Sequence, residues 1–400
     1  MAGQVQVKRH DTGAVLRTET TGGTCLQDAA DWAKANIDDT DFTSYGGVDF
    51  VCQGDLGTLV TPVDRDASSD WVITPTTTNR IRVYPDSGYE HNGNPTDTAQ
   101  GAYVNVTEAG SQVHGIAVKG TCWDIRGLRF NIDSTNSSNA AWGITLDNLL
   151  ARTDASDLYL YASDNIFNIV ADSDHAGAFN LRTCGYEGGS RALPHVLIDA
   201  NDIYGGSSDG GFLYAILLYG RIASPSGSRE AHLYVDSMQH NSVRCLWTAA
   251  TSRLIAFLLA GGQAGDEATI YLNKVYNNIA FANGGSSTAW ERIDNDNGTY
   301  ALNITGAFAN NADNDNSIAA LSFDNGSASG TLASRTVADE ITSDTNHRLK
   351  EGATLRGAGS TDTDVTEDCV GVAYKSPPNV GAFASEVSQG TYRTLTGVGL

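Results

Sequence analysis

Two aspartates and two histidines stand at matching places in consecutive repeats of the chain. The segments His195-Val-Leu-Ile-Asp199 and His232-Leu-Tyr-Val-Asp236 both begin with histidine and end with aspartate. If they stack as neighbouring strands, their carboxyl groups lie near the ~5–5.5 Å separation that retaining glycosidases use. We therefore predict all four residues as candidate catalytic groups. The alternative is that the acids are solvated surface groups, which need only water, salt or a cation to coexist.

Tyrosines fall in line on the outward side of the same segments. Tyr159, Tyr234 and Tyr271 share one outward line with Leu197 and Asn303. Exposed aromatic rings can stack on sugars, so the three tyrosines are candidate carbohydrate-binding residues. A tyrosine row equally suits a face that packs on another subunit or on an inserted loop, and plain packing is the commoner case. A second outward line is predicted to contain Tyr161, Asp199, Asp236, Asn273 and Thr305.

Two acidic runs look like the opening of a calcium loop. They are Asp294-Asn-Asp296-Asn-Gly298 and Asp313-Asn-Asp315-Asn316. A helix-loop-helix calcium site also needs a later bidentate glutamate, and none follows at the right distance. Acidic turns without metal are commoner, so we expect no cofactor. Calcium bound by these four aspartates is the alternative.

These residues belong to a series of repeats that starts at residues 157, 195, 232, 269 and 301. Within each repeat apolar residues alternate with others, as they do in half-buried strands. Repeats made of strands and turns, without helical periodicity, are typical of a solenoid. We predict an all-β solenoid with three strands per coil, in which successive coils pair in parallel about 4.8 Å apart.

The same alternation predicts which side chains fill the core and which form the turns. The expected inward pairs are Leu158/Leu160, Val196/Ile198, Leu233/Val235, Ile270/Leu272 and Leu302/Ile304. Each such side chain contributes about 1.5–3 kcal/mol when buried. An asparagine follows the first strand of most coils, and it tolerates left-handed backbone and can bond to its copies along the axis. These asparagines are Asn165, Asn201, Asn241, Asn278 and Asn310.

The two ends of the chain differ from the repeats. Residues 24–36 show the one convincing helical pattern, with Thr24 as N-cap and Gln27 completing a capping box. Its apolar face suits a cap over the first coil. We expect an N-terminal strand and helix cap in residues 1–45, a solenoid in 46–356, and a closing segment and tail in 357–400.

Composition narrows the classes of partner. The chain carries 47 acidic against 25 basic residues, a net charge of −22. Such a surface repels nucleic acid and anionic lipid, so neither is an expected partner. Adaptation to salty water is an alternative reason for the charge. No apolar run is long enough to span a bilayer, and the first residues lack the apolar core of a signal peptide. The six cysteines show no paired spacing, which favours reduced, buried thiols over a zinc site.

The repeats, the Leu26-Gln-Asp-Ala-Ala helix and the Asn379-Val-Gly-Ala-Phe close together resemble the right-handed parallel β-helix (pectate-lyase-like) superfamily over roughly residues 22–385. Within it the chain looks most like β-helix proteins carried by tailed-phage particles. The resemblance implies axial stacking and frequent homotrimers, but it implies no reaction. Lyases of this fold combine calcium-binding acids with a basic residue, and no such residue recurs on the acidic face. The galacturonan hydrolases carry Gly-His-Gly and paired aspartates, of which only His114-Gly115 is present.

We therefore expect a virion structural protein of a tailed phage or related virus, assembled in the host cytoplasm. It would serve as a capsid decoration or as a tail spike or fibre component. Its expected partners are copies of itself in a homotrimer, other virion proteins and a host-surface polysaccharide. The alternative is a polysaccharide lyase or glycoside hydrolase acting on acidic polysaccharide. A third possibility is a sugar-binding module without turnover.

Overall fold

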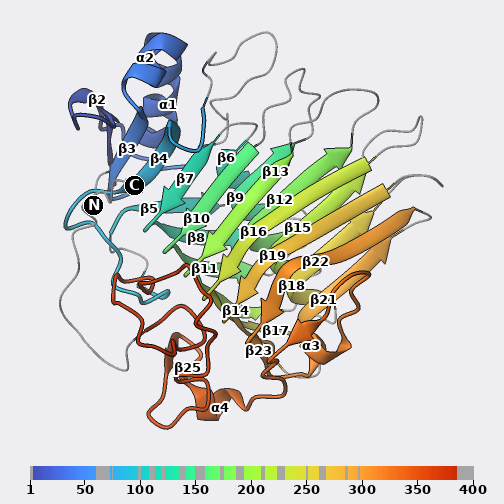
Figure 1. Ribbon diagram of the computed structural model, residues 1–400. Helices are drawn as coiled ribbons and strands as arrows, with labels where there is room; N and C mark the ends of the chain where they lie inside the picture. The colour runs from blue at the N-terminus through green and yellow to red at the C-terminus, as the bar shows by residue number, and fades with distance from the viewer. Residues whose placement is uncertain are drawn as a thin grey trace.

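Three parallel sheets wrap around one core, and successive coils stack along a single axis (Figure 1). The predicted all-β solenoid of parallel coils is thereby confirmed. The computed structural model describes residues 3–59, 73, 75–97, 101–107, 113–118, 122–134, 140–148, 158–171, 175–185, 193–208, 212–222, 230–248, 251–260, 267–283, 287–295 and 298–384.

Sheet A contains the first strand of each coil. Its strands are β1 (Gln4–Arg9), β2 (Val15–Glu19), β3 (Gly47–Gln53), β4 (Arg80–Pro85), β7 (Trp123–Arg126), β10 (Leu158–Ser163), β13 (Pro194–Asp199), β16 (Glu230–Gln239), β19 (Glu267–Tyr276), β22 (Thr299–Ala309) and β24 (Ala328–Ser329). Their order is β2-β1-β3-β4-β7-β10-β13-β16-β19-β22-β24. Strand β1 pairs antiparallel with β2 and β3, whereas the pairings from β3 onward are parallel.

Sheets B and C complete each coil. Sheet B contains β5 (Tyr103–Thr107), β8 (Arg129–Ser134), β11 (Ile166–Ala171), β14 (Asp202–Ser208), β17 (Ser242–Trp247), β20 (Ile279–Phe281) and β23 (Ala312–Asp313). Sheet C contains β6 (Val113–Val118), β9 (Ala140–Asn148), β12 (His175–Gly185), β15 (Phe212–Ile222), β18 (Ser252–Ala260) and β21 (Ser287–Asn295). Both follow chain order from one end of the solenoid to the other.

Aliphatic side chains of sheet A stack inward along the axis. Leu233, Ile270 and Leu302 occupy paired positions on β16, β19 and β22, and all three are fully buried. The other predicted inward side chains that the structure describes are also buried, whereas the side chain of Leu158 lies outside the described residues. The core therefore forms as the alternation predicted, one aliphatic layer per coil.

The predicted pairing of β13 with its neighbours is wrong by two residues. Val196 pairs with Leu160 on one side and with Val235 on the other, instead of Leu158 and Leu233. On β16 the register then jumps from Val235 to Ser237, which leaves a bulge at Asp236. A displacement by two residues keeps every side chain on its own face of the sheet, so the core prediction survived the error.

A ladder of fully buried asparagines runs along the corner where sheet A turns into sheet B. Each side-chain amide bonds to the next; Asn201 Nδ2, for example, donates to Asn241 Oδ1 at 3.0 Å and to the Ala162 carbonyl at 2.9 Å. The ladder comprises Asn165, Asn201, Asn241, Asn278 and Asn311. The predicted last member, Asn310, is therefore wrong by one residue.

The left-handed backbone at this corner belongs to the residue before each ladder asparagine. These residues have φ between 54° and 59°; they are Asp164, Ala200, His240, Asn277 and Asn310. The expectation that the ladder asparagines themselves supply this conformation is thus corrected. The amide of each asparagine is needed for bonding along the axis, and its predecessor makes the turn.

The N-terminal end is closed by helix α1 (Cys25–Asn36), which packs on β1 and β2 (Figure 1). Leu26, Ala29, Ala30 and Ala33 on its inner face are fully buried, as the pattern predicted. The Thr24 side chain does not cap the helix backbone, and its hydroxyl instead donates to the Asp28 carboxylate at 2.9 Å. A second helix, α2 (Asp39–Ser44), was not predicted from the sequence.

Beyond β24 the chain leaves the solenoid and returns along it. Helix α3 (Ser317–Ala320) precedes β24 and packs on β21 and β23, whereas helix α4 (Val337–Glu340) and the antiparallel pair β25 (Ile341–Ser343) and β26 (Asn346–Leu349) belong to this return. We call residues 341–384 the C-terminal clasp, because they cover the corner between sheets A and B (Figure 1). His347 of the clasp contacts Asp202 of β14, and the Gly381 N–H donates to the Asn277 carbonyl at 2.6 Å.

Candidate functional site

A column of stacked rings follows the outer face of sheet A. Tyr159, His195, Tyr234 and Tyr271 occupy paired positions on β10, β13, β16 and β19. Successive ring centroids lie 4.9, 4.8 and 4.7 Å apart, and their planes differ by 14–20°. The sequence had placed Leu197 in this line, and His195 takes that place because of the two-residue displacement.

The geometry of the column suits packing between coils. Each ring covers the face of the next, so the rings turn their edges to solvent, whereas stacking on a sugar needs a free ring face. Each stacked pair contributes about 0.5–1.5 kcal/mol beyond its buried area. Carbohydrate binding by Tyr159, Tyr234 and Tyr271 stays a prediction, and this geometry does not favour it.

The four predicted catalytic residues do not meet in one place. Asp199 pairs with Gln239, not with Asp236, so the expected facing carboxylates are wrong. Asp236 Oδ2 lies 2.8 Å from His195 Nδ1, and both side chains are partly exposed. His232 Nε2 lies 3.3 Å from Glu230 Oε2. Each histidine thus faces a different carboxylate, and their catalytic role stays a prediction.

Asp199 instead lines a cleft between the sheet A to sheet B corner and the clasp. This acidic cleft has a volume of about 450 Å³. Its lining carboxyl groups belong to Glu90, Asp164, Asp199, Asp364, Glu367 and Asp368. Arg126 is the one lysine or arginine among the lining residues that the structure describes. The cleft therefore concentrates negative charge in a concave, partly closed space.

Asp164 and Asp199 occupy neighbouring corners within this cleft. Asp164 has left-handed backbone with φ of 58°, and its N–H donates to the Asp199 carbonyl at 3.2 Å. Asp199 is the last residue of β13, and its Oδ1 accepts from the Ser237 hydroxyl at 2.6 Å and from the Gln239 N–H at 2.8 Å. Adjacent coils thus present two half-buried carboxyl groups to one cleft.

The two groups differ in how readily they ionise. Burial raises the pKa of Asp164 to about 7, and the charges of Asp199 and Asp368 raise it as well. The hydrogen bond from the Ser163 hydroxyl and the charge of Arg126 lower it, but they do not outweigh burial. Burial also raises the pKa of Asp199 to about 6, although its bonds from Ser237 and Gln239 oppose this. As pH rises, Asp199 therefore loses its proton before Asp164 does.

The clasp side of the cleft is tied down by its own acids. The buried Asp368 carboxylate accepts from the N–H groups of Val370, Val372 and Ala384 at 3.1, 2.7 and 2.9 Å. The Asp364 carboxylate contacts the ammonium of Lys274 on β19. Asp368 therefore shapes the wall itself, whereas Asp364 ties that wall to sheet A.

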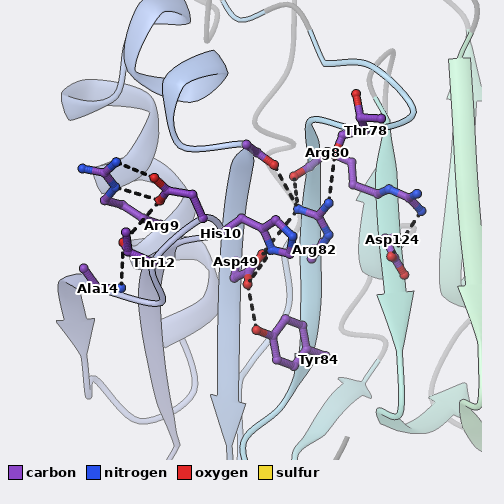
Figure 2. A network of polar contacts seen from close by, with 12 residues as sticks. Arg9, His10, Thr12, Ala14, Asp49, Thr78, Arg80, Arg82, Tyr84 and Asp124 are labelled. Atoms are coloured by element: carbon purple, nitrogen blue, oxygen red, sulfur yellow. Dashed lines mark hydrogen bonds and ion pairs between the residues drawn. The ribbon is translucent and has the colours of Figure 1, made fainter. Parts of the chain in front are cut away.

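A polar network occupies the outer face of sheet A near its N-terminal end (Figure 2). The buried Asp49 carboxylate accepts from the Tyr84 hydroxyl at 2.8 Å and lies 3.1 Å from His10 Nδ1 and 3.6 Å from an Arg82 nitrogen. The charge of Arg82 is thus balanced within the sheet, and the network joins the residue after β1 to β3 and β4.

Asp124 on β7 forms the next part of this face. Arg80 and Arg126 approach its carboxylate at 3.4 and 3.1 Å, and the Arg80 guanidinium lies 4.3 Å from the Tyr161 ring centroid. Basic groups on this face were not predicted from the sequence. Arg80 thus engages an aspartate of the neighbouring coil, and Arg126 one of its own coil.

The predicted calcium ligands serve other contacts. The fully buried Asp313 carboxylate accepts from the N–H groups of Asn316, Ile318 and Ser334. Asp315 accepts from the N–H groups of Ala289 and Ser317, and Asp294 pairs with Arg292. Asp296 lies outside the described residues. In the part of the chain that the structure describes, no three histidine, cysteine or acidic side chains are placed to hold a metal ion.

Two further sequence expectations concern thiols and membranes. Cys25, Cys52, Cys122, Cys245 and Cys369 are free and buried, whereas the side chain of Cys184 is outside the described set. Across the described ranges, none of the helices has the length and apolar character needed to cross a bilayer.

The chain matches no protein-family model and no curated protein. The acidic cleft is therefore interpreted from its own chemistry. Sequence reasoning missed Asp164 and the clasp wall. The available signal was that Asp164 directly precedes a predicted turn asparagine, as Ala200 does one coil later.

Proposed function

We propose that this chain is a structural component of a virus particle, as a capsid decoration or as part of a tail spike or fibre. The supporting observation is that two ladders, one of asparagines and one of aromatic rings, tie neighbouring coils together along the axis. A solenoid cross-tied in this way is stiff, as an element exposed on a particle must be. Its expected partners are two further copies of itself, other virion proteins and a host-surface polysaccharide.

Quantitative mass spectrometry of purified particles tests this proposal. We expect the chain to be present, at high copy number for a capsid decoration and at low copy number for a tail organ. Sedimentation equilibrium of the purified protein should give three times the chain mass. Absence from particles would refute the virion role, and a monomer would refute the trimer alone.

A second candidate function, glycoside hydrolysis, is favoured by the different environments of Asp164 and Asp199. Hydrolysis needs one protonated carboxyl to donate to the leaving oxygen and one carboxylate to activate water or attack the sugar. Asp164 keeps its proton to higher pH and suits the acid, whereas Asp199 suits the carboxylate. The acidic lining disfavours a polyanion, so a neutral glycan fits this cleft better than the acidic polysaccharide expected from the sequence.

Oligosaccharide release from neutral and acidic polysaccharides tests this second function. Asp164→Asn and Asp199→Asn should each abolish release, while the exposed Glu351→Gln should leave it unchanged. Release at the wild-type rate by both cleft variants would exclude the cleft as the site. No release from any glycan by the wild-type protein would leave the structural role as the better account.

A further inference from the structure

Acidic groups face each other across the acidic cleft. On the solenoid side are Asp164 and Asp199, and on the clasp side are Asp368, which acts on Asp164, and Asp364, which acts on Asp199. Since one wall is the clasp, the distance between these charges depends on whether the clasp is seated. Glu90 and Glu367 add to the negative lining.

Few positive charges oppose this repulsion. Arg126 acts on Asp164, and Lys274 acts on both Asp199 and Asp364. His91 also lines the cleft, and its Nε2 lies 2.5 Å from the Asp164 carbonyl. Burial lowers the pKa of His91 to about 4, so this ring is neutral when the aspartates ionise. Arg348 acts on Asp368, so three cations oppose six carboxyl groups.

We propose that the C-terminal clasp is a pH-sensitive strap, which is seated over the solenoid corner while Asp164 and Asp199 are protonated and loosens when they ionise opposite Asp368 and Asp364. The part of the clasp that lines the cleft, residues 364–371, can move while the end of the clasp near residue 384 stays bound to the solenoid. That end is held by the Gly381 N–H to the Asn277 carbonyl and by the Ala382 N–H to the Ser242 hydroxyl at 2.9 Å.

The direction of the pH dependence follows from linkage. With the clasp seated, both aspartates have pKa values raised above the ordinary 3.8, to about 7 and about 6. With the clasp lifted, water reaches them and the ordinary values return. The seated state therefore binds more protons, so seating is strongest below about pH 4 and weakens as pH rises through about 7.

The size of the effect is large even after screening is allowed for. A shift of one pKa unit changes the opening equilibrium about tenfold. Because both carboxyl groups are only half-buried, solvent reduces the full effect. We expect the open fraction to rise at least about tenfold between pH 5 and pH 8. Deprotonation of His347, whose partner is Asp202, adds a change in the same direction.

Hydrogen exchange of the full chain tests the proposal, with rates corrected for intrinsic pH dependence. Amides of residues 364–384 report on the clasp, and those of β16 report on the solenoid. Clasp protection relative to β16 should fall at least about tenfold from pH 5 to pH 8. The double variant Asp164→Asn/Asp199→Asn should lose most of this change. Glu351→Gln, an exposed clasp carboxylate outside the cleft, should keep it.

Two results would overturn the strap. One is clasp protection in the wild-type chain that does not change with pH, and the other is an unchanged pH response in the double variant. If the double variant loses β16 protection, its fold is perturbed, and the test is then made on the wild-type chain at about 1 M salt. Salt screens the repulsion between the two walls of the cleft and should reduce the pH response. A response that persists undiminished at that salt concentration would likewise overturn it.

Discussion

The substitution Asn241→Ala should destabilise the solenoid more than any exposed asparagine change. Asn241 is fully buried in the middle of the ladder. Its Nδ2 donates to the Ile198 carbonyl at 2.7 Å and to Asn278 Oδ1 at 2.9 Å. Its Oδ1 accepts from both the N–H and the Nδ2 of Asn201 at 3.0 Å. Alanine removes all four bonds.

The expected loss follows from these four bonds. Each hydrogen bond contributes about 0.5–1.5 kcal/mol net, which gives about 2–6 kcal/mol in total. The buried Asn201 N–H is left without an acceptor, and this places the expected loss in the upper half of that range. The coils next to Asn241 should lose stability first, since each coil of a solenoid contacts only its neighbours.

Denaturant unfolding, followed together with hydrogen exchange at the corner, measures this loss. Asn273→Ala on β19 is the matched control, because that side chain is exposed, and it should change the free energy of unfolding by less than about 0.5 kcal/mol. A loss below about 1 kcal/mol for Asn241→Ala, or one equal to the control, would refute the ladder as a source of stability.

Three further predictions concern a turn residue, the clasp and the column of rings. Ala200→Gly should raise the free energy of unfolding by up to about 1 kcal/mol, because alanine is strained at φ of 54°; a decrease would show that its buried methyl matters more. His347→Gln should weaken clasp seating by about 3–5 kcal/mol at pH 6, since it leaves Asp202 buried and unpaired. Burial opposes charge on His347, but the Asp202 carboxylate outweighs it and raises the pKa of His347. The stabilisation of the clasp by the His347–Asp202 pair is therefore complete below pH 6.5 and is lost at higher pH. If the difference in clasp-seating free energy between the variant and the wild type widened towards pH 9, the pairing would be contradicted. Tyr234→Ala should lower the free energy of unfolding by about 1–3 kcal/mol, because it removes two stacked contacts. Retention of the protein on a glycan array should stay unchanged. Weaker retention without any loss of stability would show that the ring binds sugar.

The sequence predicted the fold because alternation reports directly which face of a strand is buried. Leu233, Ile270 and Leu302 were assigned to one inward stack, and they form it. Alternation has a period of two, so it cannot detect a displacement by two residues. Strand β13 is displaced by two residues from its predicted pairing with β16, and the bulge at Asp236 adds one more, so Asp199 pairs with Gln239 instead of Asp236.

The candidate site depends on contacts that leave no periodic signal. Asp164 and Asp199 meet the clasp through residues such as Asp364 and Asp368, which lie far along the chain in a segment without repeats. Asn310 and Asn311 show the same limit at short range. Two adjacent asparagines are equivalent in composition, and only the backbone conformation decides that Asn310 turns and Asn311 joins the ladder.

The position of the clasp has a consequence for biogenesis. His347 follows its partner Asp202 by 145 residues, so the coils it seals are translated well before it leaves the ribosome. Until then Asp202 faces water, and the seam beside the asparagines stays open to proteases. A nascent chain that stops before the clasp would keep this seam exposed. Quality-control proteases could recognise the exposed seam and degrade the incomplete chain.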